Sequence, residues 1–125
     1  MFSHTFLGTN NVDAARKFYD ATMAALGYAG MPLPHGTAYP SPSGALIVAT
    51  PANGEPHTVS NGHTLGFKAG ESSKVDAWHA AGLANGGTDE GAPGVRANSP
   101  GQQYGAYLRD PDGNKICAFA PNPNA

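Results

Sequence analysis

The order strand, helix, several strands occurs twice along the 125 residues of the chain. The first round begins with aromatic, β-branched and small residues at 2–9, which are typical of a strand. A helix is predicted at 12–26, where apolar residues recur every three or four positions, and a further strand at 44–51. The interrupted stretch 28–43, rich in Gly and Pro, predicts only short strands at a sheet edge. A second round of the same elements restricts the chain to folds built from two similar units.

The second round follows a polar, glycine-punctuated linker. Residues 63–69 predict a strand and residues 72–87 a helix. Residues 104–110 and 115–121 predict the two strands of a hairpin. The hairpin turn Asp110-Pro111-Asp112-Gly113-Asn114 has the residues that a tight turn needs, because proline fixes φ and glycine accepts a positive φ.

Short polar side chains mark the predicted helix starts. The pair Asn10-Asn11 precedes the first helix, and Ser72 or Ser73 precedes the second. Such side chains accept a hydrogen bond from the first free backbone N–H groups of a helix, so we expect them to act as N-caps.

Charge and cysteine content narrow the function classes. Seven basic and nine acidic residues give a net charge of −2, and the basic residues are scattered, so we expect no nucleic-acid partner. Neither a signal peptide nor a run of eighteen apolar residues is present, so we expect no export and no membrane span. The single cysteine cannot form an internal disulfide, which favours a cytoplasmic location.

Four motifs in the expected order resemble the vicinal oxygen chelate superfamily of glyoxalases, bleomycin-resistance proteins and extradiol dioxygenases. They are "SHTFLGT" near the start, "NGHTLGFKA" before the second helix, "GLANGGTDEGAPGVR" after it, and "DPDGNKI" near the end. The resemblance covers nearly the whole chain.

The resemblance implies an α+β fold in which two tandem βαβββ modules form a curved mixed sheet around a cleft. Module one would cover about 1–52, the linker about 53–61 and module two about 62–125, as one domain. A small organic molecule would bind in the cleft, and many relatives of this size are homodimers.

The same resemblance implies a divalent metal, such as Zn, Ni, Mn or Fe, held by side chains from both modules. His4 corresponds to the first ligand. The usual second position falls in Ala45–Ala49, which has no ligating side chain, and Cys117 replaces the usual fourth ligand, a glutamate. With His4, Cys117 and His63 as the remaining candidates and no carboxylate at the usual places, we expect no intact metal centre of the glyoxalase type.

Two strand registers are open at the third ligand position. Strand alternation places His63 with Leu65 and Phe67, facing the helix layer, and Thr64 with Lys68, facing the cleft. Relatives commonly place the ligand three residues before the large apolar residue, which favours Thr64. A bulge would instead turn His63 inward. We therefore predict Thr64 and Lys68 in the substrate cleft and keep His63 as the alternative.

Three functions remain open, one of which is a small structural partner that keeps the fold without a binding site. In the favoured hypothesis, an enzyme of the lyase, isomerase or dioxygenase type uses His4 as a ligand or general base. In the alternative, the cleft sequesters a drug or metabolite without a metal. Tyr104 is also predicted in the substrate cleft, and it could serve an anionic or aromatic ligand together with Arg96 and Arg109. Cys117 is interpreted either as a soft metal ligand that suits zinc or as a small buried apolar residue.

Overall fold

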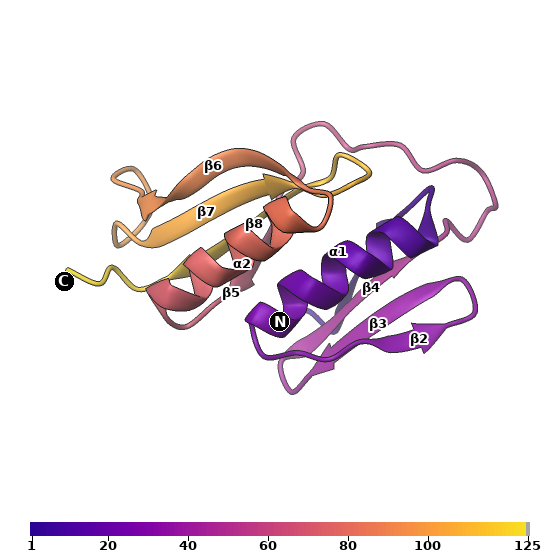
Figure 1. Cartoon of the computed structure of the whole chain (residues 1–125), viewed down its shortest axis with the longest axis horizontal. Coiled ribbons are helices and arrows are strands. Elements are labelled where there is room, and N and C mark those ends of the chain that lie inside the picture. The colour runs from indigo at the N-terminus through magenta and orange to yellow at the C-terminus, as the bar shows by residue number, and fades with distance from the viewer. Residues whose placement is uncertain (125) are drawn as a thin grey trace.

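Two βαβββ units follow one another in the computed structural model, which describes residues 1–124 (Figure 1). The first unit consists of β1 (His4–Gly8), α1 (Val12–Ala25), β2 (Met31–Leu33), β3 (Gly36–Ser41) and β4 (Gly44–Ala49). The second consists of β5 (Leu65–Lys68), α2 (Ser72–Ala84), β6 (Thr88–Val95), β7 (Tyr104–Arg109) and β8 (Lys115–Ala120). The predicted α+β fold of two tandem βαβββ units is confirmed.

Each unit forms its own four-stranded mixed sheet. The strand order is β1-β4-β3-β2 in the first sheet and β5-β8-β7-β6 in the second, so the two orders are equivalent. In both sheets the first strand pairs in parallel with the last strand, and the other neighbours are antiparallel. The repetition that was predicted from element order therefore extends to the strand pairing.

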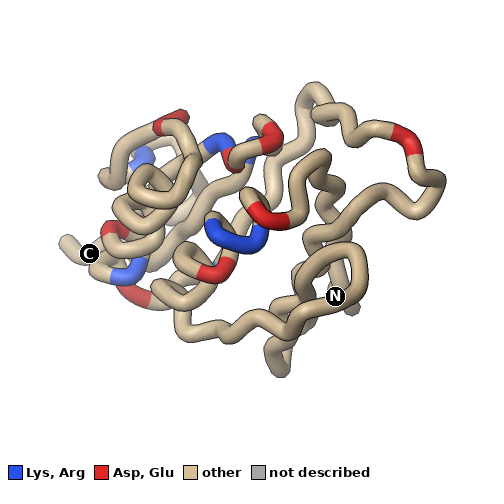
Figure 2. Tube along the Cα trace, turned by 45° about the vertical axis from the view of Figure 1, so that its right-hand side comes forward, with Lys and Arg blue, Asp and Glu red and all other residues tan. Residues whose placement is uncertain are grey.

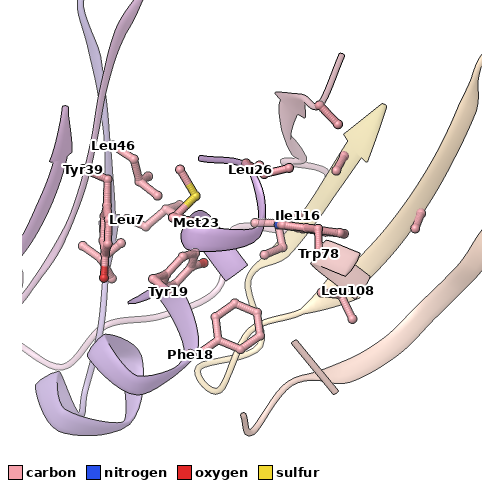
Figure 3. Close-up of a cluster of buried hydrophobic side chains, with 14 of the residues drawn as sticks. Leu7, Phe18, Tyr19, Met23, Leu26, Tyr39, Leu46, Trp78, Leu108 and Ile116 are labelled. Atoms are coloured by element: carbon pink, nitrogen blue, oxygen red, sulfur yellow. The ribbon is translucent and has the colours of Figure 1, made fainter. Parts of the chain in front are cut away.

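The two helices share one core. Each helix packs on its own sheet, and α1 also packs along α2 (Figures 1 and 3). Phe18 of α1, Trp78 of α2 and Ile116 of β8 are fully buried in this core. Burial of such side chains stabilises the fold by roughly 1.5–3 kcal/mol each. Because both helices lie on the inner faces, the opposite face of each sheet has no helix on it; we call these the open faces.

The helix starts differ from one another. Asn11 caps α1 as predicted, because its Oδ1 accepts a hydrogen bond of 3.0 Å from the backbone N–H of Ala14. The prediction of a serine cap on α2 is wrong, since Ser72 and Ser73 lie inside the helix and Glu71 precedes it without a side-chain capping bond. Packing of its buried face against the core stabilises helix α2 instead.

Strand β6 was not identified from the sequence. Its residues include Pro93 and two glycines, and its pairing with β7 shifts register between Asp89 and Gly91 and again between Gly91 and Gly94. Such bulges and a proline are tolerated at a sheet edge, where one side of the strand needs no partner. Pairing with β7 therefore forms a strand that local propensity does not indicate.

The turn before β8 joins the two units. Asp110 is 4 % exposed, and its carboxylate accepts a hydrogen bond of 2.6 Å from the hydroxyl of Tyr19 in α1. Asn114 donates from Nδ2 to the same carboxylate at 2.9 Å and to the backbone oxygen of Gly8 at 3.4 Å. The turn thus connects the second sheet to α1 and to the end of β1.

Candidate ligand-binding site

A cavity of about 260 Å³ lies between the two sheets and takes walls from both units. Strand β1 contributes His4 and Thr5, and β5 contributes Gly66, Phe67 and Lys68. Its volume is near the lower end of small-molecule sites, which measure roughly 300–1,000 Å³. We call it the central cavity.

The inner walls of the central cavity are apolar and aromatic. They come from Met23, Tyr28, Tyr39 and Leu46, which belong to α1 and its following loop, β3 and β4. Phe2 also lines the cavity but is 75 % exposed. The hydroxyl of Tyr39 is engaged with the carboxylate of Asp20 at 2.8 Å. Burial and this carboxylate raise the pKa of Tyr39, so its side chain remains a neutral phenol. These walls suit an apolar or aromatic ligand body.

His4 lies at the exposed rim of the central cavity. Strand alternation places Leu7 on the helix-facing side of β1 and leaves His4 and Phe6 exposed on the open face. The imidazole Nδ1 lies 2.8 Å from the hydroxyl oxygen of Ser3, with either atom able to donate. The other ring nitrogen makes no hydrogen bond within residues 1–124, so it is available to a ligand.

Lys68 shares this rim with His4, whereas His63 and Thr64 do not. Leu65 and Phe67 pack against the core, and Lys68 is exposed and lines the central cavity. The prediction that His63 packs beneath the helix layer is wrong. Because β5 begins only at Leu65, His63 lies in the preceding turn and is exposed. His63 and Thr64 line a different cavity of about 330 Å³.

Cys117 lies on the open face of the second sheet. It is 6 % exposed and pairs across the strands with Gly66; a Cβ atom at Gly66 would lie 3.2 Å from its sulfur. Burial raises the pKa of the Cys117 thiol to about 11, and the nearby charge of Lys115 opposes this increase without reversing it. The side chain is therefore a protonated thiol at neutral pH.

This pKa predicts slow thiol chemistry. At pH 8 we expect Cys117 to react with iodoacetamide at least about 100-fold more slowly than an unstructured cysteine of pKa about 8.5, because the thiolate is the nucleophile. The rate should rise about tenfold per pH unit up to about pH 10. Mass spectrometry of alkylated protein gives the rate, and the same chain unfolded in urea is the control. A rate that levels off near pH 8 in the folded protein would contradict the assignment.

Tyr104 lies away from the central cavity. Its hydroxyl donates a hydrogen bond of 2.6 Å to the carboxylate of Asp76 on α2, and its ring packs against the core. The hydrogen bond to Asp76 raises the pKa of Tyr104. Tyr104 thus connects β7 to the helix layer, and the structure does not bring it together with His4.

The residues expected to hold a metal do not fit a divalent ion. His4 lines the central cavity and His63 lines the cavity of about 330 Å³, while Cys117 lines neither of them. Within residues 1–124, no three His, Cys, Asp or Glu side chains gather closely enough to coordinate a metal ion. A zinc or related site needs three or four such ligands around one point. The donor set of one chain therefore does not match the metal that the resemblance implies.

Sequence reasoning identified the rim of the central cavity but not its walls. His4 and Lys68 lie on strands in which the sequence shows which side chains share a face. Met23, Tyr28 and Tyr39 lie far from β5 along the chain, and a strand or helix pattern shows only that they are apolar. Whether these three residues and β5 line one cavity depends on how the two units pack against each other.

Comparisons with known proteins agree with this fold. The family model described as Glyoxalase/Bleomycin resistance protein/Dioxygenase superfamily matches residues 1–118. The crystal structure of a glyoxalase/bleomycin resistance protein from Albidiferax ferrireducens T118 is similar at 50 % identity and a TM-score of 0.91, covering 95 % of this chain and 98 % of that one. No match was found among curated proteins.

More distant structures share the fold. A glyoxalase-related enzyme from Fulvimarina pelagi is 20 % identical with a TM-score of 0.76, covering 98 % of this chain and 88 % of that one. Lactoylglutathione lyase from Agrobacterium tumefaciens is 24 % identical with a TM-score of 0.66, covering 96 % of this chain and 92 % of that one. At these identities the likeness concerns the fold.

Proposed function

Since the chain belongs to the glyoxalase/bleomycin resistance protein/dioxygenase superfamily, we propose that it binds a small organic molecule in the central cavity and that binding needs no metal. The observation that carries this proposal is the cavity itself. It has apolar and aromatic walls from both units and two nitrogen groups, those of His4 and Lys68, at its exposed rim. Apolar walls provide affinity, and a few placed polar groups fix the orientation of the ligand.

Ala45 offers a direct test of this site. It lies on β4 and lines the central cavity, so Ala45→Trp should fill part of the space that a ligand needs. With 1-anilinonaphthalene-8-sulfonate as the probe, we expect the affinity to fall at least about tenfold, measured by fluorescence titration. This probe has an aromatic body and one negative charge, which match the walls and the rim.

Ala80→Trp is the matched control. Ala80 is exposed on α2 and does not line the central cavity. This variant adds an identical side chain and should keep the affinity of the unmodified protein. Equal losses in both variants, or no loss in Ala45→Trp, would contradict binding in the central cavity.

An enzyme is the second candidate, and the geometry of His4 favours it. Ser3 holds one imidazole nitrogen at 2.8 Å, which leaves the other to exchange a proton with a bound molecule. A compound that displaces the probe would be incubated with the protein and recovered for mass spectrometry. Unchanged recovery supports sequestration, whereas conversion that is lost in His4→Gln supports an enzyme.

We also propose a homodimer, supported by the open face of the first sheet. Its four strands contain no Asp, Glu, Lys or Arg, and Figure 2 shows no charge colour along them. Phe6 and Met31 are 48 % and 53 % exposed there. Contiguous apolar surface of this kind usually marks an interface.

Sedimentation velocity tests the dimer. We expect the unmodified protein to sediment as a dimer at micromolar concentration and Phe6→Glu as a monomer, because a carboxylate on this face would have to be desolvated in the interface. Ala24→Glu on the exposed surface of α1 makes the same change of charge and is the control. A monomeric unmodified protein would contradict the proposal.

The cellular location is a separate proposal. Within residues 1–124, none of the helices has the length and apolar character that a membrane crossing requires. A cytoplasmic location is supported by the free thiol of Cys117, since thiols stay reduced there.

A further inference from the structure

A second cavity of about 330 Å³ lies where the end of the linker meets the hairpin of β7 and β8. Its polar lining residues are Ser60, Asn61, His63, Thr64, Arg109 and Lys115. The residues that line it include no Asp or Glu, and none of them lines the central cavity. We call it the linker cavity. It combines two permanent positive charges with hydroxyl and amide groups.

Two basic side chains from paired strands line this cavity. Arg109 and Lys115 are direct cross-strand partners in the pairing of β7 with β8. Ala106, Leu108 and Ile116 are buried in the core, so alternation turns both cations toward the open face. Like charges in such a position destabilise a sheet. Glu90 offsets part of the charge of Arg109, and an anion between the two cations would remove the remaining repulsion.

The two cations differ in the contacts that they make within the protein. The Nζ of Lys115 lies 5.2 Å from the ring centroid of Tyr107 and makes no ion pair or hydrogen bond within residues 1–124. The guanidinium of Arg109 donates to the backbone oxygen of Gly113 at 3.0 Å and to Glu90 at 3.2 Å, which fixes its position. A guanidinium has five N–H donors, so several remain for a ligand.

We propose that the linker cavity binds an oxyanion, the phosphate or carboxylate group of a small molecule, between Lys115 and Arg109. Charge-assisted hydrogen bonds from an ammonium and a guanidinium are the strongest that side chains offer to such groups. The hydroxyls of Ser60 and Thr64 line the same cavity and supply neutral donors. This site is separate from the central cavity and does not depend on the function proposed for it.

Nuclear magnetic resonance titration tests the site. Inorganic phosphate and sodium benzoate are added separately to ¹⁵N-labelled protein, with sodium chloride keeping the ionic strength constant. We expect saturable shifts of the amide resonances of residues 59–64 and of Lys115 with at least one anion. The tighter of the two identifies phosphate or carboxylate as the preferred group. The absence of saturable shifts at these residues with both anions would overturn the proposal.

Lys115→Met removes the unpaired charge and keeps the apolar stem beside Tyr107. We expect it to weaken anion binding at least about tenfold, because it removes a charge-assisted hydrogen bond to the anion. Lys74→Met makes the same change on the exposed surface of α2 and should leave the affinity unchanged. Equal weakening in both variants would overturn the site in favour of general electrostatic attraction.

Thermal unfolding provides an independent readout. Phosphate or benzoate, whichever binds, should raise the Tm of the unmodified protein and of Lys74→Met but not that of Lys115→Met, because a ligand stabilises the folded state that binds it. Without the anion, Lys115→Met should be as stable as the unmodified protein or more stable, since the repulsion with Arg109 is gone. A Tm increase of equal size in Lys115→Met would contradict the proposal.

Discussion

Replacing Asp110 with alanine is expected to lower the free energy of unfolding by about 4 kcal/mol. The carboxylate accepts four hydrogen bonds. One oxygen accepts from the Tyr19 hydroxyl at 2.6 Å and from Asn114 Nδ2 at 2.9 Å, and the other from the backbone N–H groups of Asp112 and Asn114 at 3.0 and 2.9 Å. Alanine would remove every one of these acceptors.

The cost of this substitution comes mainly from the donors that remain. Tyr19 is fully buried, and Asp110 is the hydrogen-bond partner of its hydroxyl. Burial, followed by the Asp110 carboxylate, raises the pKa of Tyr19 well above its ordinary value, so the phenol stays neutral and still needs an acceptor. An unsatisfied buried donor costs about 1–3 kcal/mol. Asp110→Asn keeps one acceptor oxygen and should cost about half as much as alanine.

Urea denaturation followed by circular dichroism measures these differences. Asp112→Ala is the control in the same turn, because Asp112 accepts one exposed hydrogen bond of 2.9 Å from the backbone N–H of Asn10. It should cost about 1 kcal/mol or less. If Asp110→Ala costs no more than Asp112→Ala, the turn does not hold the two units together as inferred.

The elements with a clear apolar pattern were predictable from the sequence, and those formed by pairing were not. Helix α1 has apolar residues at every third or fourth position, and strand β8 is an apolar run that follows a turn. The observed bounds of both lie within one residue of the predicted ones. Strand β6 has glycines and a proline instead, and exists because β7 supplies a partner. Local propensity therefore fails where a neighbouring strand decides the conformation.

The candidate sites show the same division. Alternation in β5 places Lys68 on the open face with Gly66, opposite the face of Phe67, as the predicted register required. The same argument fails for His63, because the strand begins after it. The pairing of Arg109 with Lys115 was not predicted, although the turn of Asp110–Asn114 sets it. The length of a hairpin turn sets which residues pair across the strands. Counting outward from this turn would have predicted these two cations as cross-strand partners.

Gly36→Ala is expected to lower the free energy of unfolding by about 3 kcal/mol through overpacking. Gly36 is buried at the start of β3 and pairs with Ala49 of β4. A Cβ atom there would lie 2.2 Å from the backbone oxygen of Val48 and 2.4 Å from the Cβ of Ala49. These neighbours belong to the backbone or to its first side-chain atom, so no rotamer change relieves the contact. The two strands would have to separate, which weakens their hydrogen bonds.

Gly94→Ala is the matched control for this prediction. Gly94 also lies in a strand, but the nearest atom to an added Cβ is Nη1 of Arg96 at 3.4 Å, the far end of a flexible side chain. We expect a change within about 0.5 kcal/mol for this variant in the same urea denaturation experiment. A strand separation in Gly36→Ala would also move Tyr39 of β3, a wall of the central cavity, so the affinity for the anilinonaphthalene probe should fall together with stability. Stability equal to that of Gly94→Ala would show that β3 and β4 can accommodate a methyl group where the structure brings their backbones into contact.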